Sequence, residues 1–165
     1  MLAIEIEHIK VFMNKLLLQN TFDAFLLSEA AITTFTTFSI DGQFHPDFYD
    51  DETEESREIL DSTGSQVSWK IIRPYCLQLI KGKRLPLSFR FVLEYPKELI
   101  SQLLEENDLN YAAEDVFGLF LNIQYRNGQL TLTTGSSLRV FSMDHSLDQA
   151  WDRAVREFLQ LSDLD

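Results

Sequence analysis

The chain has 165 residues, of which 45% are hydrophobic, and its formal net charge at pH 7 is −12. This length and composition predict a single domain with a buried core, and they exclude collagen-like and low-complexity classes. The acidic balance argues against a general binder of nucleic acid or of anionic membranes, and the single cysteine, Cys76, excludes an intramolecular disulfide.

The first third of the chain predicts a helix, then strands, then a loop. Apolar residues at helical spacing predict a helix over residues 6–19. The β-branched and aromatic run from Ile32 to Ile40 predicts strand, and Asp41-Gly42 after it is typical of a hairpin turn. Residues 45–66 contain a proline and an acidic run, so we expect a loop there.

The middle of the chain predicts two helices around one strand. Ser68 can cap a helix over residues 69–81, and Gly82 is a plausible stop for it. Apolar and polar residues alternate over 88–95, which predicts a half-buried strand. Pro96 then opens a helix that should continue to about Asn107.

The C-terminal third contains the best-defined hairpin. Residues 117–125 and 129–134 read as strands, and Asn127-Gly128 between them favours a type I′ turn. Gly135 should end the second strand, and Leu138–Phe141 predicts one more short strand. A final helix should begin at Ser146, which forms a capping-box pattern with a glutamine three residues later.

These elements predict an α+β fold, an antiparallel β-sheet with helices packed on one face and with N- and C-terminal helices. Strands joined mostly by turns favour that architecture over a doubly wound parallel sheet. We expect residues 1–165 to form one domain. No glycine-rich turn joins a strand to a helix, so a dinucleotide site is not expected.

The charged residues are distributed unevenly. The segment from Ser62 to Leu93 contains no Asp or Glu, although acids outnumber bases in the whole chain. Its basic residues are Lys70, Arg73, Lys81, Lys83, Arg84 and Arg90.

Two interpretations of this basic segment remain open. Clustered lysines and arginines attract phosphate and carboxylate, so the segment predicts a site for a phosphorylated ligand or a nucleic acid, with Trp69 as a stacking face. Alternatively, these cations pair with the nine acids of Asp41–Asp61, inside the fold or across a homo-oligomer interface.

A second candidate site lies at the start of the acidic segment, and its residues are Asp41, His45, Asp47 and Asp50. A histidine beside carboxylates can bind a divalent cation, which makes a metal-assisted hydrolase the alternative function. The spacing lacks the central glycine of a calcium loop, and a solvated acidic surface is the competing interpretation. The chain contains no nucleophile elbow and no His-Glu-x-x-His motif, so we expect a binding protein, with no cofactor beyond that cation.

The N-terminus carries acids where a secretory signal needs a basic and then an apolar segment. No window approaches the roughly 18 consecutive apolar residues of a membrane-spanning helix. We therefore expect a cytoplasmic protein without a membrane partner.

Several segments together resemble a small family of uncharacterised bacterial proteins, a domain of unknown function from Gram-positive, gut-type anaerobes. The segments include Phe38-Ser39-Ile40-Asp41-Gly42, Leu79-Ile80-Lys81-Gly82-Lys83-Arg84, Gly118-Leu119-Phe120-Leu121 and Ala150-Trp151. The resemblance extends over nearly the whole chain. It implies a single cytosolic domain of bacterial origin and transfers no catalytic residue.

Overall fold

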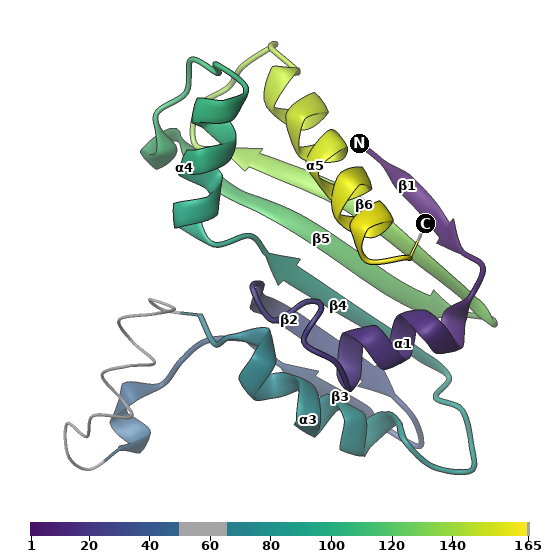
Figure 1. The fold of residues 1–165 in the computed structure, drawn as a ribbon. Coiled ribbons are helices and arrows are strands. Elements are labelled where there is room, and N and C mark those ends of the chain that lie inside the picture. The colour runs from purple at the N-terminus through teal and green to yellow at the C-terminus, as the bar shows by residue number, and fades with distance from the viewer. Residues whose placement is uncertain (50–65, 165) are drawn as a thin grey trace.

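A single six-stranded antiparallel sheet organises the protein (Figure 1). The computed structural model describes residues 1–49 and 66–164. The strands lie in the order β1-β6-β5-β4-β2-β3, and each neighbouring pair is antiparallel. The strands are β1 (Ala3–Ile6), β2 (Leu26–Thr33), β3 (Thr37–Ile40), β4 (Ser88–Glu94), β5 (Val116–Arg126) and β6 (Gln129–Leu138).

The helices gather on one face of this sheet, as Figure 1 shows. They are α1 (Ile9–Leu17), α3 (Trp69–Ile80), α4 (Lys97–Glu106) and α5 (Ser146–Leu161), with short 3₁₀ turns η1 (Pro46–Phe48) and η2 (Ala113–Asp115). The predicted α+β class, with helices near both ends of the chain, is confirmed. Within the described residues, no helix combines the length and the apolar character that crossing a bilayer requires.

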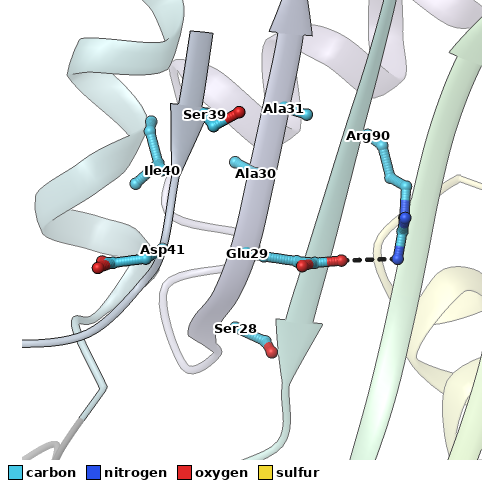
Figure 2. Close-up of a pocket in the computed structure, with 8 residues that line it drawn as sticks. All are labelled: Ser28, Glu29, Ala30, Ala31, Ser39, Ile40, Asp41 and Arg90. Atoms are coloured by element: carbon cyan, nitrogen blue, oxygen red, sulfur yellow. Dashed lines mark hydrogen bonds and ion pairs between the residues drawn. The ribbon is translucent and has the colours of Figure 1, made fainter.

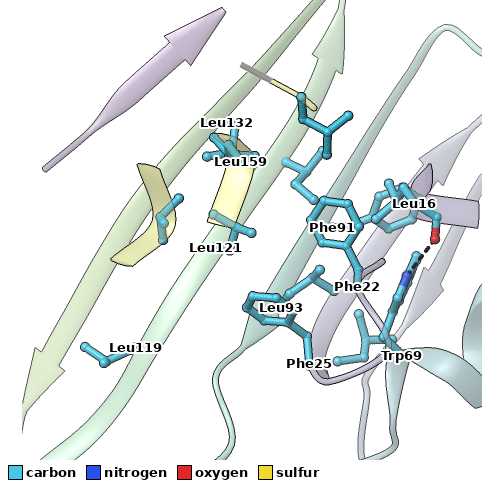
Figure 3. Close-up of a cluster of buried hydrophobic side chains, with 14 of the residues drawn as sticks. Leu16, Phe22, Phe25, Trp69, Phe91, Leu93, Leu119, Leu121, Leu132 and Leu159 are labelled. Atoms are coloured by element: carbon cyan, nitrogen blue, oxygen red, sulfur yellow. Dashed lines mark hydrogen bonds between the residues drawn. The ribbon is translucent and has the colours of Figure 1, made fainter. Parts of the chain in front are cut away.

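The hydrophobic core lies between the sheet and the helices (Figure 3). Alternate residues of β4 and β5, such as Phe91 and Leu121, are fully buried on the helical face. Trp69 of α3 is also fully buried, and its indole Nε1 donates a hydrogen bond to the Leu16 carbonyl at 2.9 Å. This bond satisfies both a buried donor and a carbonyl near the end of α1.

The opposite face of the sheet has no helix against it among the described residues. Polar side chains such as Arg90, Glu29 and Gln124 project from it. An antiparallel sheet can expose one face in this way, because its strands need no crossover helices.

Two predictions in the N-terminal part are wrong. The predicted helix over 6–19 begins only at Ile9, because residues 3–6 form β1 and pair with residues 130–133 of β6. The predicted hairpin turn at Asp41-Gly42 is replaced by a turn at Thr34–Thr36, where the Thr34 N–H donates to the Thr36 carbonyl at 2.9 Å.

The C-terminal part also differs from its prediction in two places. β6 continues through Gly135 to Leu138, and residues 139–145 contain no strand, so the predicted strand over 138–141 is wrong. The first cap position of α5 is His145 and not Ser146. The Asn127-Gly128 turn is confirmed, with φ angles of 53° and 77°.

Candidate binding surface

The structure separates the six predicted anion-binding residues into different surroundings. Arg73 belongs to the packing of the helices. Its Nε donates to Asp23 Oδ1 at 2.9 Å, its Nη2 lies 3.3 Å from the second carboxylate oxygen, and its Nη1 donates to the Leu17 carbonyl. The two side chains are only 18% and 17% exposed. Arg73 therefore joins α3 to the connection between α1 and β2.

Arg90 lies on the opposite face of the sheet and is also paired. Its Nη2 donates to Glu29 Oε1 at 2.7 Å, and its Nε donates to Asn122 Oδ1 at 3.3 Å. Lys70 is exposed in the first turn of α3. About 16 Å of helix rise separates it from Lys81, which follows the last residue of α3. These residues therefore do not join the remaining cations.

The other three cations, Lys81, Lys83 and Arg84, lie together on the connection between α3 and β4, and all three are exposed. Pro86 is buried in the same connection, between Leu85 and Leu87, which are 80% and 70% exposed. The proline therefore anchors the connection, while its neighbours project outward.

The β2–β3 turn lies beside this connection. The Leu87 N–H donates to the Thr33 carbonyl at 2.9 Å, which extends the β2–β4 pairing by one residue. Phe35 at the turn is 92% exposed and makes an edge contact with Phe38, with ring centroids 5.9 Å apart. Figure 1 shows the turn and the α3–β4 connection at the same end of the sheet.

A further cation, Arg126, reaches this end from β5. It pairs in register with Ser88 at the start of β4 and is exposed. It lies outside the acid-free segment, so sequence reasoning missed it, and only the β4–β5 register could have revealed it. We call the surface formed by Thr34–Thr36, Lys81–Leu87 and Arg126 the basic tip. Neither these segments nor the β5–β6 turn contains an Asp or Glu.

A shallow depression of about 730 Å³ lies on the open face of the sheet (Figure 2). Ser28, Ser39 and Asp41 line its polar side. The side chains of Glu29 and Arg90 also face it, and the dashed line in Figure 2 marks their ion pair. Because Glu29 pairs with Arg90 and Asp41 adds a further negative charge, the depression attracts an anionic ligand less than the basic tip does.

Two residues of the predicted metal site, Asp41 and His45, lie close together. His45 Nε2 lies 3.3 Å from Asp41 Oδ2, and both side chains are largely exposed. Asp41 Oδ1 also accepts the Gln43 N–H. Asp47 lies in η1, and Asp50 falls outside the described residues. In the part of the chain that the structure describes, no three His, Cys, Asp or Glu side chains form a group that could hold a metal.

Groups with shifted pKa values lie away from the basic tip. Burial raises the pKa of the Cys76 thiol to about 12, so this thiol carries almost no thiolate near neutral pH. Burial also raises the pKa of Glu94 above its usual range, against the opposing charge of Lys97. Cys76 lies on α3 and Glu94 on β4, so the two do not form one site.

A family model described as a family of unknown function, DUF5721, matches residues 15–165, and the chain therefore belongs to this family. No curated protein and no solved structure matches the chain. The family resemblance seen in the sequence is thus confirmed, while the bacterial origin stays a prediction. β1 and the first residues of α1 precede the matched region.

Proposed function

We propose that this member of the family is a binding module that recognises an anionic partner through the basic tip. One observation carries the proposal. Three neighbouring exposed cations lie on a connection without acids, and Arg126 lies at the same end of the sheet, in a chain whose net charge is −12. Phosphate or carboxylate groups are the chemistry that such a surface attracts.

The net negative charge does not oppose this local attraction strongly. At physiological ionic strength the Debye length is about 8 Å, so exposed charges much farther apart are largely screened from each other. Many of the described acids lie on α4, α5 and η2. Figure 1 shows α4 and the start of α5 at the end of the sheet opposite the basic tip. Two acids lie nearer, Glu5 at the end of β1 and Glu7 just after it, but β1 is three strand positions from β4, roughly 14 Å. A partner at the α3–β4 connection therefore interacts mainly with Lys81, Lys83 and Arg84.

Retention on a polyanionic heparin resin tests the proposal. The wild-type chain should be retained in dilute buffer and released by salt, because the contacts are ionic. The triple variant Lys81→Glu, Lys83→Glu, Arg84→Glu should pass through unretained.

The matched control reverses three exposed cations on α4 and α5, namely Lys97, Arg153 and Arg156. This control variant changes the net charge by the same amount as the triple variant at the tip. It should be retained on the heparin resin as the wild type is. An equal loss of heparin retention in both triple variants, or a wild-type chain that does not bind the resin, would contradict the proposal. Thermal unfolding of each variant confirms that it is folded.

The cytoplasmic location predicted from the sequence belongs to the same proposal. It is supported by Cys76, which is buried and free of any disulfide, as expected in a reducing compartment. A phosphorylated ligand and a nucleic acid are both anionic partners within the proposed class.

A further inference from the structure

The basic tip carries large apolar side chains that no other part of the described chain covers. Phe35, Leu85 and Leu87 are 92%, 80% and 70% exposed. Leu85 and Leu87 lie within a few residues of Lys83 and Arg84 in the sequence. The turn that carries Phe35 lies beside their connection, to which the Leu87–Thr33 hydrogen bond joins it. An exposed apolar group rimmed by polar residues is typical of an interaction site.

We propose that the anionic partner is a lipid bilayer, and that the basic tip docks on its surface. Phe35, Leu85 and Leu87 enter the boundary between headgroups and acyl chains. The neighbouring lysines and arginine contact the lipid phosphates. This inference rests on the proposed function, because it names the class of partner for the same cations. It replaces the expectation, drawn from the composition of the whole chain, that the protein has no membrane partner, because the local charge at the tip is opposite in sign to the net charge.

The backbone holds these apolar side chains outward before any contact with lipid. The hydrogen bond from Leu87 N–H to the Thr33 carbonyl joins the two connections. Pro86 is buried between the two exposed leucines, which fixes the connection against the protein. The Thr34–Thr36 bond closes the turn that carries Phe35. These contacts hold the backbone beside Leu87 and Phe35 before docking, which lowers the conformational entropy lost there when the tip docks.

The combination of apolar and basic groups is what reversible attachment to a membrane requires. One weak apolar anchor gives only marginal binding, and a basic patch adds attraction to anionic lipids. The cytoplasmic leaflet, which the predicted location would make available, is rich in such lipids.

The identity of the apolar residues favours lipid over single-stranded nucleic acid. Nucleic acid bases stack on the faces of aromatic rings. Two of the three exposed apolar residues, Leu85 and Leu87, are aliphatic and provide no such face. Leucine side chains are suited to burial among lipid acyl chains. The aromatic ring of Phe35 is suited both to acyl chains and to stacking on a base.

The test compares binding to vesicles with binding to the heparin resin. The vesicles are phosphatidylcholine alone, and phosphatidylcholine with phosphatidylglycerol, and binding is measured by co-sedimentation. The wild-type chain should sediment with the anionic vesicles only. The double variant Phe35→Ser, Leu85→Ser should lower its partitioning by about tenfold or more, because apolar burial is lost. Its retention on heparin should not change.

The control variant is Phe48→Ser. Phe48 is 83% exposed, but it lies outside the basic tip and directly follows an acid, Asp47. This variant should bind vesicles as the wild type does. Since Phe35 and Leu85 are exposed, their replacement should leave the thermal midpoint unchanged.

The two proposals fail differently in this experiment. If the wild-type chain binds heparin but not anionic vesicles, or if the double variant binds vesicles unchanged, the lipid inference is overturned and the proposed function stands. Binding of a short single-stranded oligonucleotide in place of vesicles, weakened by Phe35→Ser, would assign the tip to nucleic acid. If the wild-type chain binds neither resin nor vesicles, both proposals fail.

Discussion

At the scale of single residues, two glycines show how surroundings decide what a position tolerates. Gly42 and Gly128 both have left-handed backbone conformations, with φ angles of 70° and 77°. A Cβ atom on Gly42 would lie 2.3 Å from the Leu27 carbonyl oxygen and 2.5 Å from that of Ser28. A Cβ atom on Gly128 would meet nothing within 4 Å. Gly42 therefore allows the chain after β3 to approach the irregular start of β2.

We expect Gly42→Ala to lower the free energy of unfolding by about 3 kcal/mol or more, through backbone overlap added to the left-handed penalty. Gly128→Ala, the matched control, should cost about 1 kcal/mol, because only the conformational penalty applies. Urea denaturation of both variants measures the two values. Equal losses would show that the backbone contact at Gly42 has no energetic weight.

At the scale of elements, the start of α5 is stabilised by a residue that the sequence pattern did not select. Asp144 Oδ1 accepts the Ser146 N–H at 2.9 Å, and Oδ2 accepts the Ser146 hydroxyl at 2.9 Å and that of Tyr111 at 3.1 Å. The backbone hydrogen bond from Ser146, with these hydroxyl bonds, lowers the pKa of Asp144. The predicted capping box at Ser146 and Gln149 does not form, since no side-chain cap bond comes from the cap position.

We expect Asp144→Ala to lower the thermal midpoint at pH 7 and to have little effect in strong acid. Because the folded pKa lies below the unfolded one, the stabilisation is complete above the unfolded pKa of about 4 and is lost as the pH falls through the folded pKa. Thermal unfolding of both chains from neutral to strongly acidic pH measures the difference.

The control for this series is Ser146→Ala, which keeps the carboxylate and the backbone N–H. It should retain most of the pH dependence and have a smaller effect at neutral pH. A difference between Asp144→Ala and wild type that stays constant into strong acid would rule out the ionised cap.

At the scale of the whole molecule, the first residues of the chain complete the sheet at its far edge. β1, at the start of the chain, pairs with residues 130–133 of β6, which are near the other end of the sequence. The Leu2 N–H also donates to Thr134 Oγ1 at 2.8 Å. The N-terminal amine lies 3.3 Å from Asp152 of α5, and Ile6 is buried in the core. These residues precede the region matched by the family model, yet they cover the edge of its longest hairpin.

We expect deletion of residues 1–6 to lower the free energy of unfolding by about 3 kcal/mol or more, since a buried isoleucine and a row of hydrogen bonds are lost. The uncovered β6 edge should also promote self-association, because unpaired strand edges are templates for pairing. Denaturation and light scattering report the two effects. Glu5→Ala, an exposed change on the same strand, is the control and should alter neither. A truncated chain that is monomeric and equally stable would contradict this role of β1.

Much of the fold could be predicted because its signals are local. The alternation in β4, the apolar spacing of α3 and α4, and the Asn127-Gly128 turn each depend on residues within one element. Within the candidate site, the exposure of Lys81, Lys83 and Arg84 followed from their place between a helix and a strand. The prediction failed at β1 because this strand depends on pairing with β6, which is distant in the sequence. It failed at the end of β6 because that end is extended by pairing with the start of β5, which local sequence does not reveal.

The sequence by itself determined the fold class, the main helices and the acid-free character of one segment, because these follow from periodicity and composition. Only the tertiary structure decided which cations are paired with acids and which lie exposed at one end of the sheet. It paired Arg73 with Asp23, paired Arg90 with Glu29, and placed Arg126 at the end of the sheet that carries the basic tip. The physical reason is that charge attraction acts between neighbours in space, and strand register and helix packing decide which residues are neighbours.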